Sequence, residues 1–417
     1  MLPSRVSVLV AGGGAAGFMA AITAAEAGAT DVWVLEATAE PLNKVRISGG
    51  GRCNVTHACW DPRALVGHYP RGGAALRGPF SRFASGDAVA WFDAHGLELV
   101  EESDGRMFPR ANRSSAVIAT LRRAAQAAGV EVVTSEALQA AEAVESRFRL
   151  RLRSGRTLSC DRLVLATGSH PSGRRLAASL GHGLVPPVPS LFSLSLAGQP
   201  LAALAGVVMD PVQLELLPPQ GRRGPRHQRQ LQRGPVLITH RGLSGPATLR
   251  LTAFAARMLQ EQQYCGDLLV DWTGGWSQAE LEDCFQSARR EQGRRQLGSS
   301  RPWPALSRRL WLALLEEQGL DPARRWADLP RRSELALITA LRSSRYTIAG
   351  RGPFGEEFVT AGGIPLGEMN LATMESRCCP GLYLVGELLD VDGVTGGFNF
   401  QHCWSSGWVA GQALAAS

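Results

Sequence analysis

The chain has 417 residues, of which 45% are hydrophobic and 47 are glycine, a composition typical of a soluble α/β enzyme with two or three domains. No stretch approaches 18 uninterrupted apolar residues, and the N-terminus lacks a signal-peptide layout, so we expect a cytoplasmic protein without a membrane span. The net charge of +7 permits an anionic partner such as RNA, but arginine is abundant throughout, and this composition explains the charge without any ligand.

The eight cysteines contain no CxxC pair and no zinc-ligand spacing, which favours reduced thiols and predicts no metal site. Cys378 and Cys379 are adjacent and cannot easily bridge each other, so we interpret them as loop thiols.

A glycine-rich turn stands between a predicted strand and a predicted helix near the N-terminus. The apolar run Val6–Val10 leads into the segment 12–17, GGGAAG, and the alanine-rich stretch Phe18–Ala27 is predicted to be helical. A second apolar run, Val32–Leu35, ends on Glu36. Strand, glycine turn, helix, strand and acid together form the dinucleotide-binding pattern in its required context. A plain glycine turn between a strand and a helix would need neither the acid nor three glycines at this spacing.

Each residue of this pattern has a physical role. Gly12 permits the tight turn, Gly14 lets the backbone approach a pyrophosphate, and Gly17 lets the helix pack on the strand. Ala15 and Ala16 lie at the helix N-terminus, which faces the phosphates, and Glu36 is placed to accept hydrogen bonds from ribose hydroxyls.

A second glycine-rich segment, Asn43–Asn54, follows directly. Lys44 is the sole lysine of the chain beside 43 arginines, and an ammonium differs from a planar guanidinium in reach and shape, so we interpret it as close to the cofactor. Three consecutive glycines after a serine fit neither a strand nor a helix interior, so we expect a loop along the cofactor. Its residues are Ser48, Gly49, Gly50, Gly51, Arg52, Cys53 and Asn54.

Further along, a helix over 114–128 precedes a strand at 130–133, whose Val133 is another candidate cofactor contact. The run 148–153 alternates with a period of two and predicts a half-exposed strand, with a turn at Ser154-Gly155 and a partner strand after it. A buried strand over 163–168 closes on Ala-Thr-Gly, so Thr167 and Gly168 are expected to cover a flavin dinucleotide.

The composition changes near Pro186, where proline-rich joints begin. Strands are predicted at 207–217, 236–239 and 268–272, and helices at 278–292, 304–318 and 332–341. A basic stretch within 218–234 is interpreted as a solvated hairpin, with an RNA contact as the alternative. Its arginines are Arg222, Arg223, Arg226, Arg229 and Arg233.

The chain then returns to the first domain near 360–364. A strand at 382–385 is followed by Gly386 and Glu387, whose carboxylate suits a ribityl hydroxyl. The segment 396–401 opens the last helix and contains Gly397, Phe398 and Asn399. The positive end of that helix would stabilise negative charge near N1 and C2 of a reduced flavin, by roughly 1–2 kcal/mol if partly buried.

These residues resemble the YhiN/BaiN-type bacterial flavoproteins, also labelled the aminoacetone oxidase family. The matching stretches are AGGGAAG (11–17), KVRISGGGRCNVTH (44–57), GRMFPRANRSSAVIATL (105–121), ITHRGLSGPA (238–247), TAGGIPL (360–366) and GLYLVGELLDVDGVTGGFNFQ (381–401). Two departures are Ser169–Gly173, where the family usually has a second glycine after Ala-Thr-Gly, and Phe398 with Phe400, where Tyr and Leu are frequent.

The resemblance implies an α/β, Rossmann-like FAD-binding domain of the two-dinucleotide-binding-domain type, with an inserted region of β-barrel-like and helical structure. We expect residues 1–186 and 356–417 to form the FAD domain and residues 187–355 to form the insert. FAD should be bound tightly but not covalently.

Relatives are associated with reduction of conjugated enones, oxidation of an aminoketone and reduction of a uridine in ribosomal RNA, and the fold does not choose among them. Our first hypothesis is hydride transfer through flavin N5 to or from a C=C or C–N centre of a small molecule. Cys53, His240 and His402 are candidate proton donors, although each also has a plain structural interpretation.

Three alternatives remain. An RNA-binding enzyme could reduce a ribosomal uridine and dock through Arg222–Arg233, and a redox sensor with a silent flavin is also compatible. A disulfide oxidoreductase is disfavoured because Cys53 and Cys59 have five intervening residues instead of four and no second GxGxxG follows Gly168. NADH or NADPH would therefore have to dock directly at the flavin, unless another donor is used. The sequence does not indicate an oligomeric state.

Overall fold

The computed structural model describes residues 2–217, 230–352 and 359–416. The chain divides into two compact units, of which unit 1 comprises 1–188 and 359–417 and unit 2 comprises 189–358. The predicted boundaries were 186/187 and 355/356. Four of the five arginines of the basic stretch, Arg222, Arg223, Arg226 and Arg229, lie outside the described residues, and Arg233 lies in a strand of unit 2.

Unit 1 is built on a mixed sheet whose main strand order is β18-β19-β20-β9-β1-β2-β6, with β7 and β8 attached along β9. Its central strands β20, β9, β1, β2 and β6 are mutually parallel. The bounds are β1 Arg5–Ala11, β2 Val32–Leu35, β6 Glu131–Val133, β7 Leu138–Val144, β8 Arg147–Leu152, β9 Thr157–Leu165, β18 Met369–Asn370, β19 Glu375–Ser376 and β20 Leu382–Leu384.

The remaining elements of unit 1 are shorter strands and helices around this sheet. The strands are β3 Thr56–His57, β4 Leu99–Glu101, β5 Arg106–Pro109, β10 Val185–Ser190 and β17 Val359–Gly363. The helices are α1 Ala15–Glu26, α2 Asn43–Gly51, α3 Pro62–Leu65, α4 Arg77–Arg82, α5 Ser85–Ala94, α6 Ser114–Ala127, α7 Pro171–Ser179 and α13 Phe398–Ala415.

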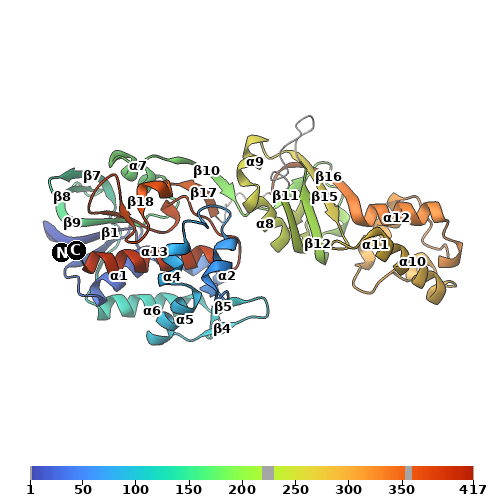
Figure 1. The fold of residues 1–417 in the computed structure, drawn as a ribbon, viewed down its shortest axis with the longest axis horizontal. Coiled ribbons are helices and arrows are strands. Elements are labelled where there is room, and N and C mark those ends of the chain that lie inside the picture. Colours follow the sequence, from blue (N-terminus) through green and yellow to red (C-terminus); the bar gives the residue numbers. More distant parts are fainter. Residues whose placement is uncertain (1, 218–229, 353–358, 417) are drawn as a thin grey trace. The chain divides into compact units, whose positions relative to one another are not determined.

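The first and last helices of unit 1 run side by side (Figure 1). Two glycines of α13 allow this close approach: a Cβ on Gly407 would lie 2.6 Å from the carbonyl oxygen of Ala16, and one on Gly411 would lie 2.6 Å from Cβ of Thr23. The alanine-rich composition of α1 and this pair of glycines therefore let segments from the two ends of the chain form one core.

Two predicted elements differ from the structure. The helix after the first glycine turn begins at Ala15, three residues earlier than predicted, because the turn already places Gly14 at its N-cap. The buried strand at 163–168 belongs to one long strand, β9, which starts at Thr157. Its first half pairs antiparallel with β8, and its second half pairs parallel with β20. The two halves of one strand therefore differ in strand pairing and in burial pattern.

Unit 2 contains a closed six-stranded antiparallel barrel in the order β11-β14-β13-β12-β15-β16, which confirms the predicted barrel-like region. The strands are β11 Leu194–Leu196, β12 Val208–Leu216, β13 Gln230–Ile238, β14 Gly242–Ser244, β15 Gly266–Asp271 and β16 Ser344–Arg351. The helices are α8 Pro246–Phe254, α9 Ala256–Glu261, α10 Gln278–Gln292, α11 Arg308–Glu317 and α12 Arg331–Ser343.

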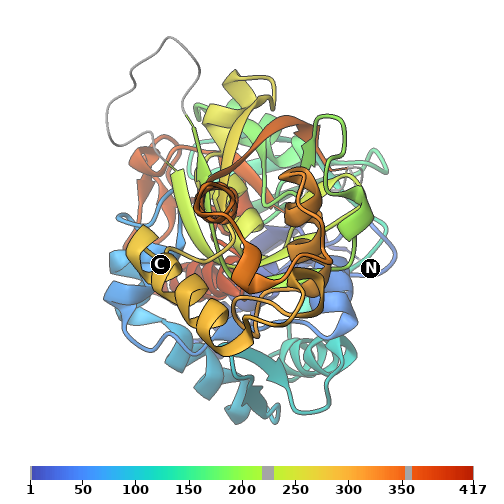
Figure 2. The same ribbon diagram turned by 90° about the vertical axis from the view of Figure 1, so that its right-hand side faces the viewer.

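The helices α10, α11 and α12 gather beyond one end of the barrel (Figure 1), and Figure 2 looks onto this helical group. One apolar core runs from the barrel into the helices. At its helical end Trp311 and Trp326 are fully buried and stack at 5.9 Å with an interplanar angle of 3°. Within the described residues, no helix combines the length and apolar character that crossing a bilayer requires.

Candidate functional site

The first glycine turn joins β1 to α1 under tight steric limits. Gly12 has a φ of +118°, and a Cβ there would lie 2.4 Å from the carbonyl oxygen of Ala166. A Cβ on Gly17 would lie 2.0 Å from the carbonyl oxygen of Gly12. By contrast, the Cβ position of Gly14 is open, and no side chain caps α1. The turn therefore leaves an accessible helix N-terminus, the usual location of an anion.

Glu36 is fixed directly after β2. Its Oε2 accepts a hydrogen bond from the backbone N–H of Gly13 at 2.9 Å, and its Oε1 accepts from the backbone and hydroxyl of Thr38, both at 2.8 Å. The backbone N–H of Glu36 donates to the carbonyl of Val133 at 2.8 Å, which brings the predicted Val133 to the same edge. A carboxylate has about four acceptor positions, so Glu36 can still accept from a ribose hydroxyl.

The second glycine segment begins as the helix α2 and then leaves helical geometry. Ser48 has a ψ of 149°, and Gly49 and Gly50 have φ of +57° and +67°, in the left-handed region. The expectation that these glycines form a loop is therefore confirmed. The Cβ positions of Gly50 and Gly51 are open, so the backbone of this loop is accessible to a ligand.

Lys44 connects three segments that are distant in the sequence. Its Nζ donates to Oε2 of Glu387 at 2.5 Å and to Oγ of Ser169 at 3.1 Å. A Cβ on Gly168 would lie 3.6 Å from the same carboxylate oxygen and 3.8 Å from Nζ. Lys44, Gly168 and Glu387 thus meet beyond the carboxyl ends of β9 and β20, the edge of a parallel sheet where ligands bind.

The segment Ser169–Gly173, which departs from the family pattern, forms the start of α7. The ring Nδ1 of His170 accepts from the backbone N–H of Ser172 at 3.2 Å and caps the helix. A Cβ on Gly173 would lie 1.6 Å from Oγ1 of Thr167. The predicted Thr167 therefore directs its hydroxyl at α7, and Gly173 is the residue that leaves space for it.

The N-terminus of α13 carries no side-chain cap, and its N-cap residue Gly397 has a φ of +93°. A Cβ on Gly397 would lie 2.6 Å from the carbonyl oxygen of Thr56. With the amide of Asn54 oriented so that its oxygen faces Gly397, this oxygen accepts a hydrogen bond from the N–H of Gly397 at 3.0 Å. Asn399 forms two hydrogen bonds with the backbone of Gly393. Both predicted asparagines thus use their amides to shape the entrance to α13.

Aromatic rings gather beside this helix N-terminus. The ring of Phe398 stacks on His68 at 4.1 Å and on His57 at 4.8 Å, and Tyr69 donates from its hydroxyl to the carbonyl of Phe398 at 2.6 Å. Burial lowers the pKa of His57, whose ring is therefore neutral near pH 7. Phe398 was predicted from the sequence as a cofactor contact, whereas His57, His68 and Tyr69 were not, although His57 closes the quoted run at 44–57.

The structure separates the three candidate proton donors. Cys53 and His402 belong to unit 1, whereas His240 is exposed in the turn between β13 and β14 of unit 2. Burial raises the pKa of the Cys53 thiol to about 12, which makes it a weak acid. Burial lowers the pKa of His402 to about 4, and its Nε2 lies 3.2 Å from the carbonyl oxygen of Gly386, which can only accept. A neutral imidazole in that tautomer has no second proton to give.

Two further features bear on the site. Arg71 forms an ion pair with Asp392, whose side chain is fully buried, and so ties the loop before α13 to the N-terminal half of unit 1. Cys53 and Cys59 are both free thiols.

Comparison with known proteins identifies the family. The model described as "HI0933-like protein Rossmann domain" matches residues 6–413. The chain belongs to this family. The resemblance to the YhiN/BaiN-type flavoproteins is thereby confirmed, and the protein is a Rossmann-fold, FAD-dependent oxidoreductase.

Two relatives cover nearly the whole chain. The 3-dehydro-bile acid delta(4,6)-reductase of Clostridium scindens is 31% identical over 432 aligned residues, 99% of both chains. The ribosomal RNA dihydrouridine synthase of Escherichia coli is 30% identical over 425 residues, again 99% of both chains.

Two solved structures share the fold. The 3-ketosteroid delta1-dehydrogenase of Sterolibacterium denitrificans has a TM-score of 0.51 and 13% identity, with 99% of this chain and 100% of that chain covered. The quinol fumarate reductase of E. coli has a TM-score of 0.50 and 13% identity, with 100% and 71% covered.

Proposed function

We propose that the protein uses FAD to reduce a carbon–carbon double bond conjugated to a carbonyl group in a small molecule. The observation that carries the proposal is the 31% identity, over 99% of both chains, to a reductase named for such a bond. A C–N centre, which the sequence left open, is the less favoured form of the same reaction.

The arrangement of unit 1 fits FAD on its own evidence. The open Cβ position of Gly14 and the uncapped start of α1 suit the pyrophosphate, and Glu36 suits the ribose of the adenosine half. The accessible loop at Gly50 and the Lys44–Glu387 pair suit the flavin half. The proposed FAD contacts are Gly12, Gly14, Ala15, Ala16, Gly17, Glu36, Lys44, Ser48–Asn54, Val133, Thr167, Gly168, Gly386, Glu387 and Gly397–Asn399.

Bound FAD would supply the hydride chemistry, and the residues of the chain would orient the reactants and control charge. The uncapped N-terminus of α13 favours negative charge placed near it, by roughly 1–2 kcal/mol if partly buried. Lys44 holds the Glu387 carboxylate at the sheet edge, and the aromatic group at Phe398 supplies a flat apolar surface.

Reduction of the double bond adds a hydride to one carbon and a proton to the other. Neither the buried thiol of Cys53 nor His402 is suited to supply this proton. The pKa of Cys53, about 12, is far above working pH, and the one N–H of neutral His402 donates to the carbonyl oxygen of Gly386. Solvent can supply this proton, and the role of His240, which lies in unit 2, stays a prediction. His402 then acts as a positioning residue for Gly386 and Glu387.

The second candidate function is reduction of a uridine in ribosomal RNA. The 30% identity to the E. coli dihydrouridine synthase over 99% of both chains favours it. The uridine C5=C6 bond is also conjugated to a carbonyl, so the residues of unit 1 serve either substrate. The predicted RNA contact at Arg222–Arg233 remains a proposal.

Anaerobic reduction of the purified yellow protein tests both candidates. We would reduce it with NADH, NADPH or dithionite and then add a steroid 4,6-dien-3-one, a simple enone, or ribosomal RNA containing uridine. Reoxidation of the flavin by the dienone with formation of its dihydro product supports the proposal. Reoxidation by RNA alone would replace it with the second candidate, and reoxidation by neither would contradict both.

The RNA candidate has a test of its own. Replacing Arg222, Arg223 and Arg226 with alanine should flatten the slope of log affinity against log salt by about two units if each arginine contacts a phosphate. An unchanged slope, with an intact flavin spectrum, would remove this stretch from the RNA contact.

A further inference from the structure

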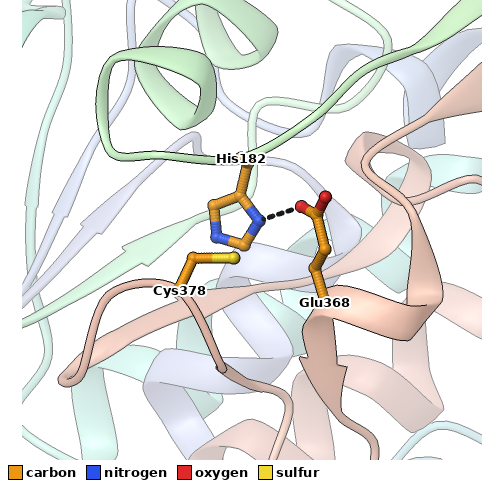
Figure 3. Close-up of side chains that lie close together, drawn as sticks. All are labelled: His182, Glu368 and Cys378. Carbon is orange, nitrogen blue, oxygen red and sulfur yellow. Dashed lines mark hydrogen bonds and ion pairs between the residues drawn. The ribbon is translucent and has the colours of Figure 1, made fainter.

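One group of metal-ligating side chains in unit 1 lies apart from the proposed FAD contacts. His182 follows α7, Glu368 ends the short helix η6 (Leu366–Glu368), and Cys378 follows β19 (Figure 3). One ligand atom from each, a ring nitrogen, a carboxylate oxygen and Sγ, lies within 4.8 Å of the other two. We propose that His182, Glu368 and Cys378 bind one Zn²⁺ ion, with water as the fourth ligand.

The imidazole of His182 is held at both nitrogens. Its Nδ1 lies 2.8 Å from Oε2 of Glu368, and its Nε2 lies 2.8 Å from Oγ of Ser376. Metal-bound histidines are generally oriented in this way, by a partner on the nitrogen that does not face the metal. A metal ion on Nδ1 would replace the proton that Nδ1 shares with Glu368, while Ser376 keeps the ring in place.

The other two ligands are also supported by neighbouring groups. The backbone N–H of Gly183 lies 3.2 and 3.1 Å from Oε1 and Oε2 of Glu368, and a Cβ at Gly183 would come within 2.8 Å of Oε1. The backbone N–H of Cys378 donates to Oγ of Ser376 at 3.0 Å. Ser376 thus connects His182 to Cys378, and a side chain at position 183 would have to displace the carboxylate of Glu368.

Donor chemistry favours zinc over Mg²⁺ and Ca²⁺, and the exposure of the ligands leaves an ion access. The His182 side chain is fully buried, Glu368 is 28% exposed and Cys378 is exposed, so an ion has both an entry path and room for a water ligand. Imidazole, thiolate and carboxylate are the donors that Zn²⁺ takes, whereas Mg²⁺ and Ca²⁺ select oxygen ligands. Three protein ligands leave one tetrahedral position open.

The sequence predicted no metal site because its cysteines lack zinc-ligand spacing. The ligands are instead contributed by positions 182, 368 and 378, and the fold assembles them. The backbone N–H of Arg377 donates to the carbonyl of Glu368 at 2.8 Å, which holds two of the ligand-bearing segments together. A network of His182, Glu368 and Ser376 without any ion is the competing interpretation.

Zn²⁺ titration of the FAD-loaded full-length protein distinguishes the two interpretations. We expect one equivalent of Zn²⁺ to bind in competition with a chromogenic indicator. We also expect Co²⁺ to give the strong visible bands of a tetrahedral thiolate site, at longer wavelength than oxidised flavin absorbs. Neither readout depends on enzyme activity.

Two ligand variants and one matched control complete the test. Cys378→Ser and Glu368→Gln should each weaken Zn²⁺ binding by about tenfold or more, and Cys378→Ser should also abolish the tetrahedral Co²⁺ bands. Cys265→Ser, which removes an exposed thiol from unit 2, should change neither. An unchanged flavin spectrum reports that each variant is folded. Absence of stoichiometric binding, or Co²⁺ bands that survive Cys378→Ser, would overturn the site.

Discussion

The two units of this protein are specified in different ways. Both units contain glycines where a side chain would collide with backbone, such as Gly12 in unit 1 and Gly242 in unit 2. At the proposed FAD site of unit 1, polar groups from distant segments also meet, as Lys44, Ser169 and Glu387 do. In unit 2 a closed barrel and a helical group share one continuous apolar core. Unit 1 therefore depends on particular residues at particular positions, whereas unit 2 depends chiefly on apolar volume, which many sequences can supply.

The largest expected effect tests whether stability in unit 2 comes from this core. Trp326→Ala removes a fully buried ring that stacks on Trp311 and should lower the free energy of unfolding by about 3–5 kcal/mol. Chemical denaturation followed by tryptophan fluorescence measures it. FAD affinity should stay within error, because every proposed FAD contact lies in unit 1. Release of FAD before unfolding would show that the units do not behave separately.

The next effect concerns a buried polar group of unit 1. The pKa of His402 is about 4 in the folded protein and 6.5 in the unfolded chain, so the unfolded chain binds the proton first as pH falls. The contribution of His402 to the free energy of unfolding is then constant above pH 6.5 and decreases between pH 6.5 and 4, by about 3 kcal/mol. His402→Gln should flatten this part of the profile, and His240→Gln, at an exposed position, should not. Parallel profiles for parent and His402→Gln would contradict the assignment.

Glu36 tests the cofactor assignment. Glu36→Ala should weaken FAD binding by about 1.5–3 kcal/mol, because it removes charge-assisted hydrogen bonds to the ribose and loosens the turn at Gly13. Equilibrium dialysis of the apoprotein with FAD measures the change. Glu40→Ala removes a nearby carboxylate whose partners are the surface arginines Arg46 and Arg122, and should have no effect. Equal FAD affinity in parent and Glu36→Ala would refute the placement of the ribose.

A smaller effect is expected at Lys44. In Lys44→Arg, a planar guanidinium replaces the single ammonium nitrogen that donates to both Glu387 and Ser169, and it cannot reproduce this geometry. FAD affinity or the rate of flavin reduction should fall about fivefold, as expected for a part-exposed ion pair. Arg46→Lys exchanges a cation on the same helix and should change neither. If both quantities survive Lys44→Arg, the sole lysine is an accident of composition.

The smallest expected effect is none at all. Cys53 and Cys59 are free thiols, so dithionite should deliver two electrons per flavin in an anaerobic titration. Uptake of four electrons, falling to two in Cys59→Ser, would instead support the disulfide-oxidoreductase alternative.

Local sequence patterns predicted the parts of the molecule that local physics determines. The glycine turn, Glu36, the loop at Ser48–Gly51 and helix α10 at 278–292 all follow from residues close to each other in the chain. β9 was predicted as two separate strands, because its two halves pair with different neighbours and show different burial patterns.

Other parts of the site depend on contacts across the sequence and could not be predicted from it. The ion pair of Arg71 with Asp392 joins residues 321 positions apart, and the stacking of His57 on Phe398 needs the C-terminal helix in place. The same holds for the Lys44–Glu387 pair, for which the rarity of lysine was the one local signal. The sequence named Lys44, Glu387 and Phe398 as candidates but not Arg71, Asp392 or His57. The packing of the completed fold fixes the partners of all six residues.

The side-by-side packing of α1 and α13 has a consequence for biosynthesis. The two helices are separated in the sequence by residues 27–397, which include all of unit 2 and much of unit 1. At a ribosomal rate of about 5–20 residues per second, α1 therefore waits roughly 20–75 s for its partner. During that interval the apolar face that α13 will cover is open to chaperones and to neighbouring chains. FAD insertion would then follow the synthesis of Glu387 and the start of α13, because both belong to the proposed FAD contacts. Ribosome-bound chains halted before Phe398 should retain no flavin, whereas released full-length chains should retain it.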